Sequence, residues 1–398
     1  MAEQALYPGH TLGIIGNSSN GPLLVNAARR VGLNVATFTS ESNSEIASLA
    51  DAVFIGAFSD RQRLQAFAEN CDVVTYESEH VPASVIEFIS QFTRVPQGAE
   101  TLTMMQDRSL ERAFFESLNI NIPPYATVVE LDDIYVSAAA IGYPAVLKPL
   151  QKGIETEQQL TLRSQADAPL AADMLQQGPH ILEATIPKAQ EISVLVAKGY
   201  PQVNQLDDQI QVFPIIETNY QQGRLLRALA PARLSADVTA EIKRMTVNIA
   251  THLHYYGVFQ LSFLLTETGN LFLRDLVPAM DRSGLVFDKG ATQTMFEVHL
   301  HAVAGLPLAA PTQYAATVLA SFDDDQLEAI RTQWLLKATW EFVFYHKSGR
   351  QISPAAGHVL IQAPTVQDAL NQLSATTIWD PARPVPPTPS RIERNQAL

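Results

Sequence analysis

The chain has 398 residues, of which 46 % are hydrophobic and 17 % charged, so it is long enough for two or three domains and too apolar for a disordered chain. Its 27 Lys and Arg residues against 41 Asp and Glu residues give a formal charge of −14. No basic run interleaves with aromatic residues, which argues against nucleic acid and anionic membranes as partners. The single cysteine, Cys71, excludes an intramolecular disulfide and a multi-cysteine metal site.

The N-terminal residues lack the basic-then-apolar pattern of a signal peptide, and no apolar run approaches the ~18 residues that span a bilayer. We therefore expect a cytoplasmic protein. An anionic substrate of so acidic a chain needs a local basic pocket.

The first hundred residues alternate between strand and helix patterns. The segment "TLGIIGNSSNGPLLVNAARRVGLNVATFTS" predicts a strand, a turn, a helix with Leu24, Ala28 and Val31 on one face, and a second strand. "DAVFIGAF" and "CDVVTYES" predict two further strands around a helix from Arg61 to Glu69. We expect a small doubly wound α/β sheet that ends near Pro96.

The middle of the chain changes to an antiparallel pattern. A helix is expected from Thr101 through Leu118, followed by a strand, "GYPAVLK", that ends in Lys148. "HILEATI" and "EISVLVAKGYPQVNQ" predict two strands in the style of an antiparallel sheet.

The next elements are a long helix and a hairpin. Ser235 is the expected N-cap of the helix, and Gly257 is expected to terminate it. "VFQLSFLLTETGNLFLRDLVP" predicts two strands joined by a Gly269-Asn270 turn. A smaller domain is expected from about residue 304, and residues 381–398 form a Pro-rich tail.

The order of several motifs resembles the ATP-grasp superfamily and, within it, the 5-(carboxyamino)imidazole ribonucleotide synthase family. The matching motifs are "DVVTYESEHVP", "MMQDRSLER", "GYPAVLK", "ILEATIPKAQEISVLVAKG", "LAPARLS" and "AGLPL". The resemblance implies an α/β and α+β chain with an N-terminal α/β domain at residues 1–100, an ATP-grasp domain at 101–303 and a small C-terminal domain at 304–380.

The resemblance also implies a reaction. Members of this family join bicarbonate to aminoimidazole ribonucleotide in purine biosynthesis, through a carboxyphosphate formed at the expense of ATP, with Mg²⁺ as the metal. It therefore implies an ATP-dependent carbon–nitrogen ligase whose partners are small molecules, and a homodimer.

Four residues match family positions that contact ATP. Arg108 and Lys148 match cations that neutralise the phosphates, and Glu183 and Glu191 match acids that face adenine and ribose. The structural alternatives are a solvated helix face for Arg108, a solvated strand end for Lys148 and surface acids for the two glutamates.

The chain departs from the family in its glycine-rich loops and in its metal site. The phosphate clamp reads "KGIETEQQ" at residues 152–159, where Glu155 and Glu157 would repel phosphate. The opening loop "GNSSNG" keeps only Gly16 and Gly21 as glycines that could contact a substrate.

Ser262 and Asp275 stand where the family has two metal-binding glutamates. Asp275 is therefore the one expected Mg²⁺ ligand, and serine is a poor neutral ligand for this hard cation. In "AMDRSG", Asp281 and Arg282 replace a neutral pair of the family pattern. The resemblance makes Asp275 and Arg282 the candidate catalytic residues.

The ribonucleotide end keeps part of its family pattern. Lys347 and His358 match substrate-binding positions in "KSGRQISPAAGHV", and Arg350 lies next to a missing arginine. Glu77 matches an acid that orients the amine substrate.

Two alternative functions remain open from the sequence alone. The altered clamp and the serine at position 262 would also suit a non-catalytic or substrate-shifted relative that binds nucleotide. Dinucleotide binding by the first domain is less consistent with the residues, because "GNSSNG" has too few glycines for G-x-G-x-x-G.

Overall fold

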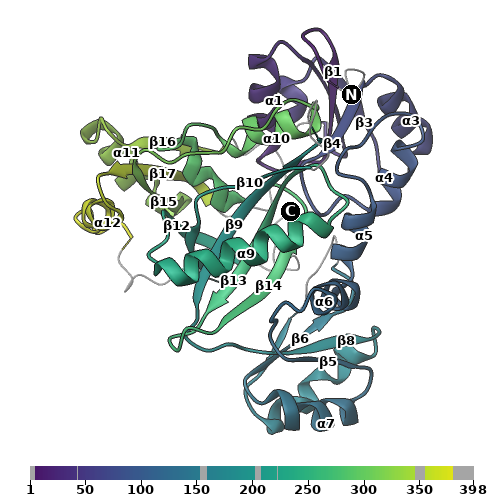
Figure 1. The fold of residues 1–398 in the computed structure, drawn as a ribbon, viewed down its shortest axis with the longest axis vertical. Coiled ribbons are helices and arrows are strands. Elements are labelled where there is room, and N and C mark those ends of the chain that lie inside the picture. The colour runs from purple at the N-terminus through teal and green to yellow at the C-terminus, as the bar shows by residue number, and fades with distance from the viewer. Residues whose placement is uncertain are drawn as a thin grey trace. The chain divides into compact units, whose positions relative to one another are not determined.

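The computed structural model describes residues 5–42, 44–152, 159–201, 208–221, 223–345 and 355–379 (Figure 1). The chain divides into two compact units. The first comprises Met1–Phe213, Leu234–Asp281 and Met295–Ala310, and the second Pro214–Arg233, Arg282–Thr294 and Pro311–Leu398. The predicted Pro-rich tail, residues 381–398, lies outside the described residues.

The first unit begins with the predicted doubly wound sheet. Its four strands are parallel in the order β3-β2-β1-β4, with bounds β1 Thr11–Ile15, β2 Asn34–Thr39, β3 Ala52–Ile55 and β4 Val73–Tyr76. The helices between and after them are α1 Gly21–Arg30, α2 Glu45–Leu49, α3 Arg61–Glu69 and α4 Ala83–Ile89. Strands β1 and β4 are almost wholly buried, as expected for a parallel sheet with helices around it.

The helix predicted from Thr101 to Leu118 is wrong in one respect, because the structure divides it at Asp107. Helix α5 spans Glu100–Gln106 and α6 spans Arg108–Ser117. Asp107 is extended, with φ −118° and ψ 116°, and its side chain accepts hydrogen bonds from the N–H groups of Ser109 and Leu110. Aspartate is a favoured N-cap, so this residue starts a second helix instead of continuing the first.

A second sheet of the first unit follows α6. Its antiparallel strands lie in the order β5-β8-β6-β7, with bounds β5 Tyr125–Val128, β6 Ala145–Pro149, β7 Leu160–Leu162 and β8 His180–Ala184. Helices α7 (Leu131–Ile141) and α8 (Ala172–Leu175) accompany it, and apolar side chains such as Leu147 and Leu182 form its core.

The third group of strands in the first unit is also antiparallel. Strand β9 (Gln190–Gly199) pairs with β10 (Gln209–Val212) and with β13 (Gly257–Leu265), which pairs in turn with β14 (Leu271–Val277). The predicted strands "HILEATI" and "EISVLVAKGYPQVNQ" thus become β8 and β9 of different sheets. The predicted hairpin around Gly269-Asn270 is confirmed by β13 and β14.

The long helix, α9, spans Ala236–His252, and α10 spans Met295–Val303. Ser235 caps α9 by accepting a hydrogen bond from the N–H group of Val238, as predicted. Gly257 does not terminate this helix, which ends five residues earlier, but begins β13 with φ +151°. No helix of the described residues is both long and apolar enough to cross a membrane.

The second unit is built on antiparallel strands in the order β11-β12-β15-β17-β16. Strand β11 (Ile216–Gln221) pairs with β12 (Arg224–Ala230), which pairs with β15 (Ala316–Asp323). Strand β17 (Ala355–Ala363) lies between β15 and β16 (Glu341–Phe344). Helices α11 (Leu327–Leu336) and α12 (Val366–Ser374) complete the unit, whose core contains Phe322, Trp340 and Val359.

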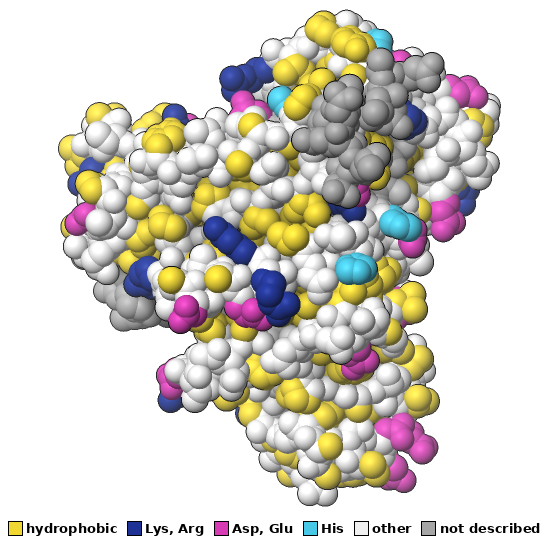
Figure 2. Space-filling model, viewed as in Figure 1, with side chains coloured by type: hydrophobic (Ala, Val, Ile, Leu, Met, Phe, Trp, Pro, Cys, Tyr) yellow, Lys and Arg dark blue, Asp and Glu magenta, His cyan; other side chains and the backbone are white. Residues whose placement is uncertain are grey.

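Charge on the visible surface is dispersed. On the face shown in Figure 2, Lys and Arg side chains occur singly or in small groups and form no continuous basic strip.

Candidate functional site

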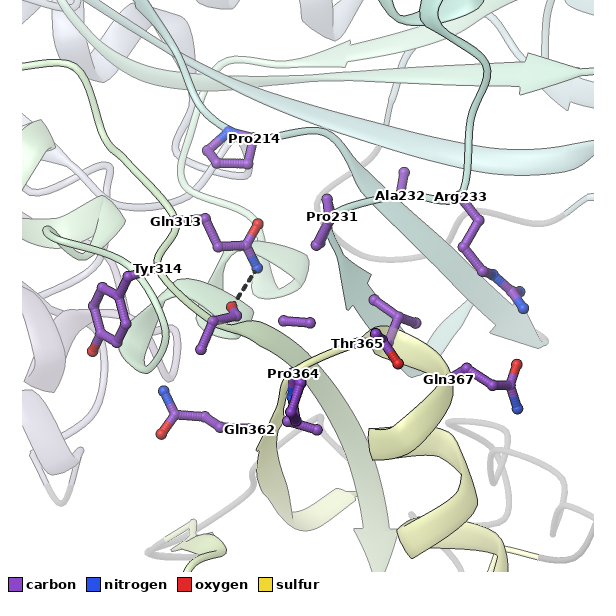
Figure 3. A pocket seen from close by; sticks show the side chains of 14 residues that line it. Pro214, Pro231, Ala232, Arg233, Gln313, Tyr314, Gln362, Pro364, Thr365 and Gln367 are labelled. Atoms are coloured by element: carbon purple, nitrogen blue, oxygen red, sulfur yellow. Dashed lines mark hydrogen bonds between the residues drawn. The ribbon is translucent and has the colours of Figure 1, made fainter.

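A groove with a volume of about 980 Å³ lies within the second unit (Figure 3). Its lining is largely apolar and includes Pro214, Pro231, Tyr314 and Pro364. Arg233 is the charged residue in this lining, and it is paired with Glu217 through its guanidinium group. None of the predicted site residues lines this groove, and it offers no acid or lysine for phosphate chemistry.

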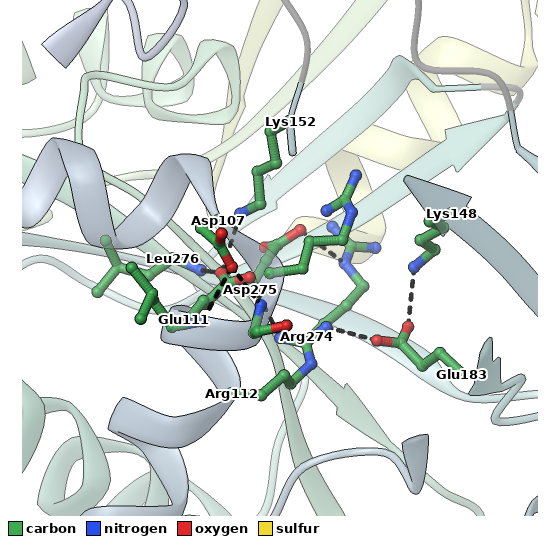
Figure 4. A network of polar contacts seen from close by, with 12 residues as sticks. Asp107, Glu111, Arg112, Lys148, Lys152, Glu183, Arg274, Asp275 and Leu276 are labelled. Atoms are coloured by element: carbon green, nitrogen blue, oxygen red, sulfur yellow. Dashed lines mark hydrogen bonds and ion pairs between the residues drawn. The ribbon is translucent and has the colours of Figure 1, made fainter. Parts of the chain in front are cut away.

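The predicted cation Lys148 lies in a buried network of charged side chains in the first unit (Figure 4). Lys148, near the end of β6, donates from Nζ to Oε1 of Glu183 on the adjacent strand β8 at 2.8 Å. Arg112 on α6 pairs with the other carboxylate oxygen of Glu183. Lys148 is only 15 % exposed, so it is not a solvated strand end.

The network continues from Arg112 toward the hairpin. Glu111 pairs with Arg112 at 3.3 Å and with Nζ of Lys152 at 3.0 Å. The other contact of its carboxylate is with the backbone, since Oε1 accepts a hydrogen bond from the N–H group of Leu276 on β14 at 3.1 Å. The ion pairs therefore form a chain of alternating bases and acids, in the order Lys148, Glu183, Arg112, Glu111 and Lys152. Through its hydrogen bond with Leu276, Glu111 connects helix α6 to the β13–β14 hairpin.

The pairing keeps these buried groups ionised. Burial by itself raises the pKa of the Glu183 carboxyl, but Lys148 and Arg112 outweigh this effect and hold that pKa below its ordinary value. Burial likewise opposes the charge of Arg112, yet Glu111 and Glu183 raise the pKa of its guanidinium group. Lys148, Lys152 and Arg112 thus place three basic side chains close together, each paired with a carboxylate, and such side chains bind polyphosphates.

Asp275 lies at the edge of the same cluster. It is directly opposite Ser262 in the β13–β14 register, as predicted, and Nε of Arg274 lies 3.4 Å from its Oδ2. Burial raises the pKa of Asp275, but Arg274, Lys152, a hydrogen bond with Ser262 and Arg112 together lower it to about 2. Arg274 also pairs with Glu191 on β9 at 3.2 Å, so this predicted ATP contact has a cationic partner.

The side chains at this position do not fit a protein-bound Mg²⁺. Within the described residues, no three His, Cys, Asp or Glu side chains are placed to hold a metal ion. Oδ1 of Asp275 is buried and accepts no hydrogen bond from the described residues, so this position offers a metal one buried carboxylate oxygen. The facing ligand is the neutral hydroxyl of Ser262, whereas Mg²⁺ prefers carboxylate oxygens.

The predicted substrate residues Gly16 and Glu77 lie together beside β1. Oε1 of Glu77 accepts a hydrogen bond from the N–H group of Ser18 at 2.6 Å, and the Ser18 hydroxyl also binds this carboxylate. Gly16 has φ +139°, and a Cβ atom there would lie 2.3 Å from Oε1 of Glu77, so only glycine allows this close approach. Gly21 is the buried first residue of α1.

Burial, opposed by the Ser18 hydrogen bonds, raises the pKa of Glu77 to about 7 from an ordinary value of 4.5. Since the folded protein holds this proton where the unfolded chain has released it, stability should fall as the pH rises between these two values. In the native protein the free energy of unfolding should fall by about 3 kcal/mol over this window, which is the pKa difference times 1.36 kcal/mol. Glu77→Gln should abolish this fall. Urea unfolding at about pH 5 and about pH 8 measures the loss, and an unchanged pH dependence in the variant would contradict the assignment.

Arg108 occupies the first turn of α6 and is buried. Its Nε donates to the carbonyl oxygen of Pro149 at 3.1 Å, and its backbone N–H donates to the carbonyl oxygen of Leu150 at 2.9 Å. Arg108 therefore contacts the segment that directly follows Lys148, and it is not a solvated helix residue.

The remaining described candidates meet in the second unit. The guanidinium carbon of Arg282 lies 4.8 Å from the ring centre of Tyr345, and the Tyr345 hydroxyl is 2.7 Å from Nδ1 of His358. Burial and, to a smaller extent, Arg282 lower the pKa of His358 to about 3, so its ring is neutral at physiological pH. Nε2 of His358 has no hydrogen-bond partner among the described residues.

Several predicted residues cannot be placed. Lys347 and Arg350 lie outside the described residues, as do residues 153–158 of the altered clamp with Glu155 and Glu157. Sequence analysis did not single out Glu111, Arg112, Lys152 or Arg274 as site residues. Arg112 follows Arg108 by four residues on a predicted helix, and this i, i+4 spacing was a usable signal that both cations share a face.

Two family models match consecutive stretches of the chain. The family described as an ATP-grasp domain matches residues 113–296, and the family described as a ribonucleotide synthetase preATP-grasp domain matches residues 10–106. The preATP-grasp range contains the parallel sheet. The ATP-grasp range contains most of the charged network, whereas Glu111 and Arg112 lie between the two ranges.

Similar proteins extend over nearly the whole chain. The N5-carboxyaminoimidazole ribonucleotide synthase of Bacillus subtilis is 26 % identical over 359 residues, which are 90 % of this chain and 93 % of that protein. The enzyme of the same name from Staphylococcus aureus (strain N315) is 25 % identical and covers 89 % of this chain and 92 % of its own length.

Solved structures show the same fold. A crystal structure of the ADP complex of an N5-carboxyaminoimidazole ribonucleotide synthetase has a TM-score of 0.87 at 26 % identity, over 95 % of this chain and 98 % of that one. The synthase from Aspergillus clavatus, in complex with ADP and 5-aminoimidazole ribonucleotide, has a TM-score of 0.82 at 21 % identity, over 93 % of this chain and 98 % of that one. At that identity the second likeness concerns the fold alone.

Proposed function

Because the chain belongs to the N5-carboxyaminoimidazole ribonucleotide synthase family of the ATP-grasp superfamily, we propose that it carboxylates aminoimidazole ribonucleotide with bicarbonate at the expense of ATP. The observation that supports this most is the buried network of Lys148, Glu183 and Arg112. It joins a strand end, a neighbouring strand and a helix in one cationic cluster.

The proposed reaction has two steps. A bicarbonate oxygen attacks the γ-phosphorus of ATP, so a P–O bond forms to give carboxyphosphate and the bond to ADP breaks. The exocyclic amine of the ribonucleotide then forms a C–N bond to the carboxyl carbon, phosphate leaves with the oxygen that attacked, and the amine loses a proton. Both steps move negative charge among phosphate oxygens, which fixed cations stabilise.

We assign the phosphates to the cations near β6 and α6. Lys148 and Arg108 are the predicted contacts, and Arg112 joins them because its guanidinium group lies on the same carboxylate as Lys148. Glu183 and Glu191 are proposed to contact adenine and ribose. Glu183 is in addition a positioning residue, since it holds the Lys148 amino group and the Arg112 guanidinium group.

We assign the amine substrate to the residues beside β1. Glu77 can exchange a proton near neutral pH and lies against Gly16. The ribonucleotide phosphate is assigned to Lys347, Arg350 and His358, of which Lys347 and His358 match family positions. Arg282 is proposed to act on the reacting groups. Asp275 is proposed to help hold these cations and not to act as one half of a metal-binding pair, since Ser262 provides no second carboxylate.

The non-catalytic alternative is less favoured, because relatives that match about nine tenths of this chain are named as synthases. Dinucleotide binding by the first domain is likewise less favoured, since the family that matches residues 10–106 is the preATP-grasp domain. A homodimer and a cytoplasmic location belong to the proposal as well.

The proposed function is tested by phosphate release from ATP in the presence and absence of the two other substrates. We expect release that requires both aminoimidazole ribonucleotide and bicarbonate, and that falls to background in a Lys148→Met variant. The proposal would be refuted if phosphate release were the same with and without the ribonucleotide, or if the native protein and the Lys148→Met variant released phosphate at equal rates under all conditions.

A further inference from the structure

Among the described residues, four basic and four acidic side chains are joined by ion pairs in the network that includes Asp275. The bases are Arg112, Lys148, Lys152 and Arg274, and the acids are Glu111, Glu183, Glu191 and Asp275 itself. Their formal sum is 4 − 4 = 0. A site built to attract a divalent cation carries an excess of carboxylates, and this cluster has none.

One base, Arg274, contacts the Asp275 carboxylate, and two further bases act on it through their charge alone. Arg274 lies 3.4 Å from Oδ2, and Lys152 and Arg112 add to its effect in stabilising the ionised form of this group. A divalent cation at Asp275 would lie beside a guanidinium group already paired with this carboxylate, in a cluster whose bases and acids balance and which therefore has no excess negative charge to hold the ion.

The opposite strand reinforces this arrangement. Ser262 is 2 % exposed and lies directly across from Asp275, so the position facing the carboxylate is filled by a short, neutral, buried side chain. At the hairpin, a guanidinium group paired with Asp275 and a neutral residue opposite it thus stand where an ion would need two acids.

Resting on the nucleotide binding proposed above, we infer that Arg274, Lys152 and Arg112 replace a protein-bound divalent cation at the Ser262–Asp275 pair, so that the affinity for an adenine nucleotide does not depend on Mg²⁺. Guanidinium groups suit this task because they stay charged when buried and can bind phosphate oxygens in pairs.

Calorimetric titration with the non-hydrolysable analogue adenosine 5′-(β,γ-imido)triphosphate tests the inference, once with excess Mg²⁺ and once with EDTA. We expect dissociation constants that agree within about threefold. Binding that is about tenfold or more tighter with Mg²⁺ would overturn the inference and leave the proposed function intact. Binding in neither buffer would overturn both.

An Arg274→Gln variant tests the mechanism in the same titration. Arg274 is 28 % exposed, so its neutral replacement should fold, which the melting temperature checks. We expect the variant to bind the nucleotide analogue about tenfold more weakly in EDTA than with Mg²⁺, because an added cation then has to neutralise the phosphate charge that Arg274 neutralises in the native protein. Arg244→Gln, which breaks an exposed pair with Glu241 on α9, is the matched control and should stay metal-independent. A metal-independent Arg274→Gln protein with native affinity would refute the role of Arg274.

Discussion

Replacing Lys148 with methionine is expected to weaken ATP binding by about tenfold to a hundredfold, because a charged hydrogen bond contributes about 1.5–3 kcal/mol. Methionine keeps most of the side chain's length and apolar contacts while it removes the ammonium group. Lys148 lies near the end of strand β6, and its side chain is 15 % exposed. Its amino group can therefore reach a ligand without a movement of helix α6.

The titration of ATP by calorimetry measures this effect. Lys243→Met is the matched control, because Lys243 is an exposed residue of α9 and its loss should leave the affinity unchanged. A Lys148→Met protein that binds ATP as tightly as the native protein would remove Lys148 from the nucleotide site.

The second large effect is expected for stability. Arg112→Met should lower the free energy of unfolding by about 3–5 kcal/mol, because it leaves the buried carboxylates of Glu111 and Glu183 without their shared partner. The Arg112 and Glu183 side chains are 2 % and 7 % exposed, so water cannot take the place of the guanidinium group. The midpoint and slope of urea unfolding provide the measurement.

A double variant separates the lost ion pair from lost packing. Arg112→Met combined with Glu183→Gln should recover part of the stability, since one of the two carboxylates that shared the guanidinium group is then neutral. Arg244→Met breaks an exposed pair with Glu241 and should change the stability little. If Arg112→Met costs no more than this control, the buried network does not stabilise the fold as described.

Much of the fold could be predicted from local patterns. The alternation in the first hundred residues, the N-cap at Ser235 and the Gly269-Asn270 hairpin all depend on residues that are close in sequence, and all three appear in the structure. The break at Asp107 also carried a local signal, because aspartate before a helical stretch is a favoured N-cap, but the apolar pattern on both sides of it suggested one continuous helix.

Pairings between distant segments could not be predicted in this way. Strands β8 and β9 follow each other closely in sequence, yet hydrogen bonds to β6 and to β13 assign them to different sheets. These partners are chosen by burial on both faces of the sheets, which local periodicity does not reveal.

The candidate site shows the same division. The resemblance selected Lys148 and Glu183, but their contact spans 35 residues and the contact of Arg112 with Glu183 spans 71. Arg112, Lys152 and Arg274 are ordinary basic residues in the sequence, and only the packing of α6 against β14 reveals that they surround one acid. The same applies to Glu77, whose unusual proton affinity comes from burial beside Ser18, 59 residues away.

The central claim, that ATP activates bicarbonate for transfer to an amine, is tested most directly by following an oxygen atom. Bicarbonate labelled with ¹⁸O is incubated with the protein, unlabelled ATP and aminoimidazole ribonucleotide in unlabelled water, and the phosphate released is analysed by mass spectrometry. The account predicts that each phosphate carries one oxygen from bicarbonate, because the oxygen that attacks phosphorus leaves with it. Phosphate whose new oxygen comes only from water would contradict the account.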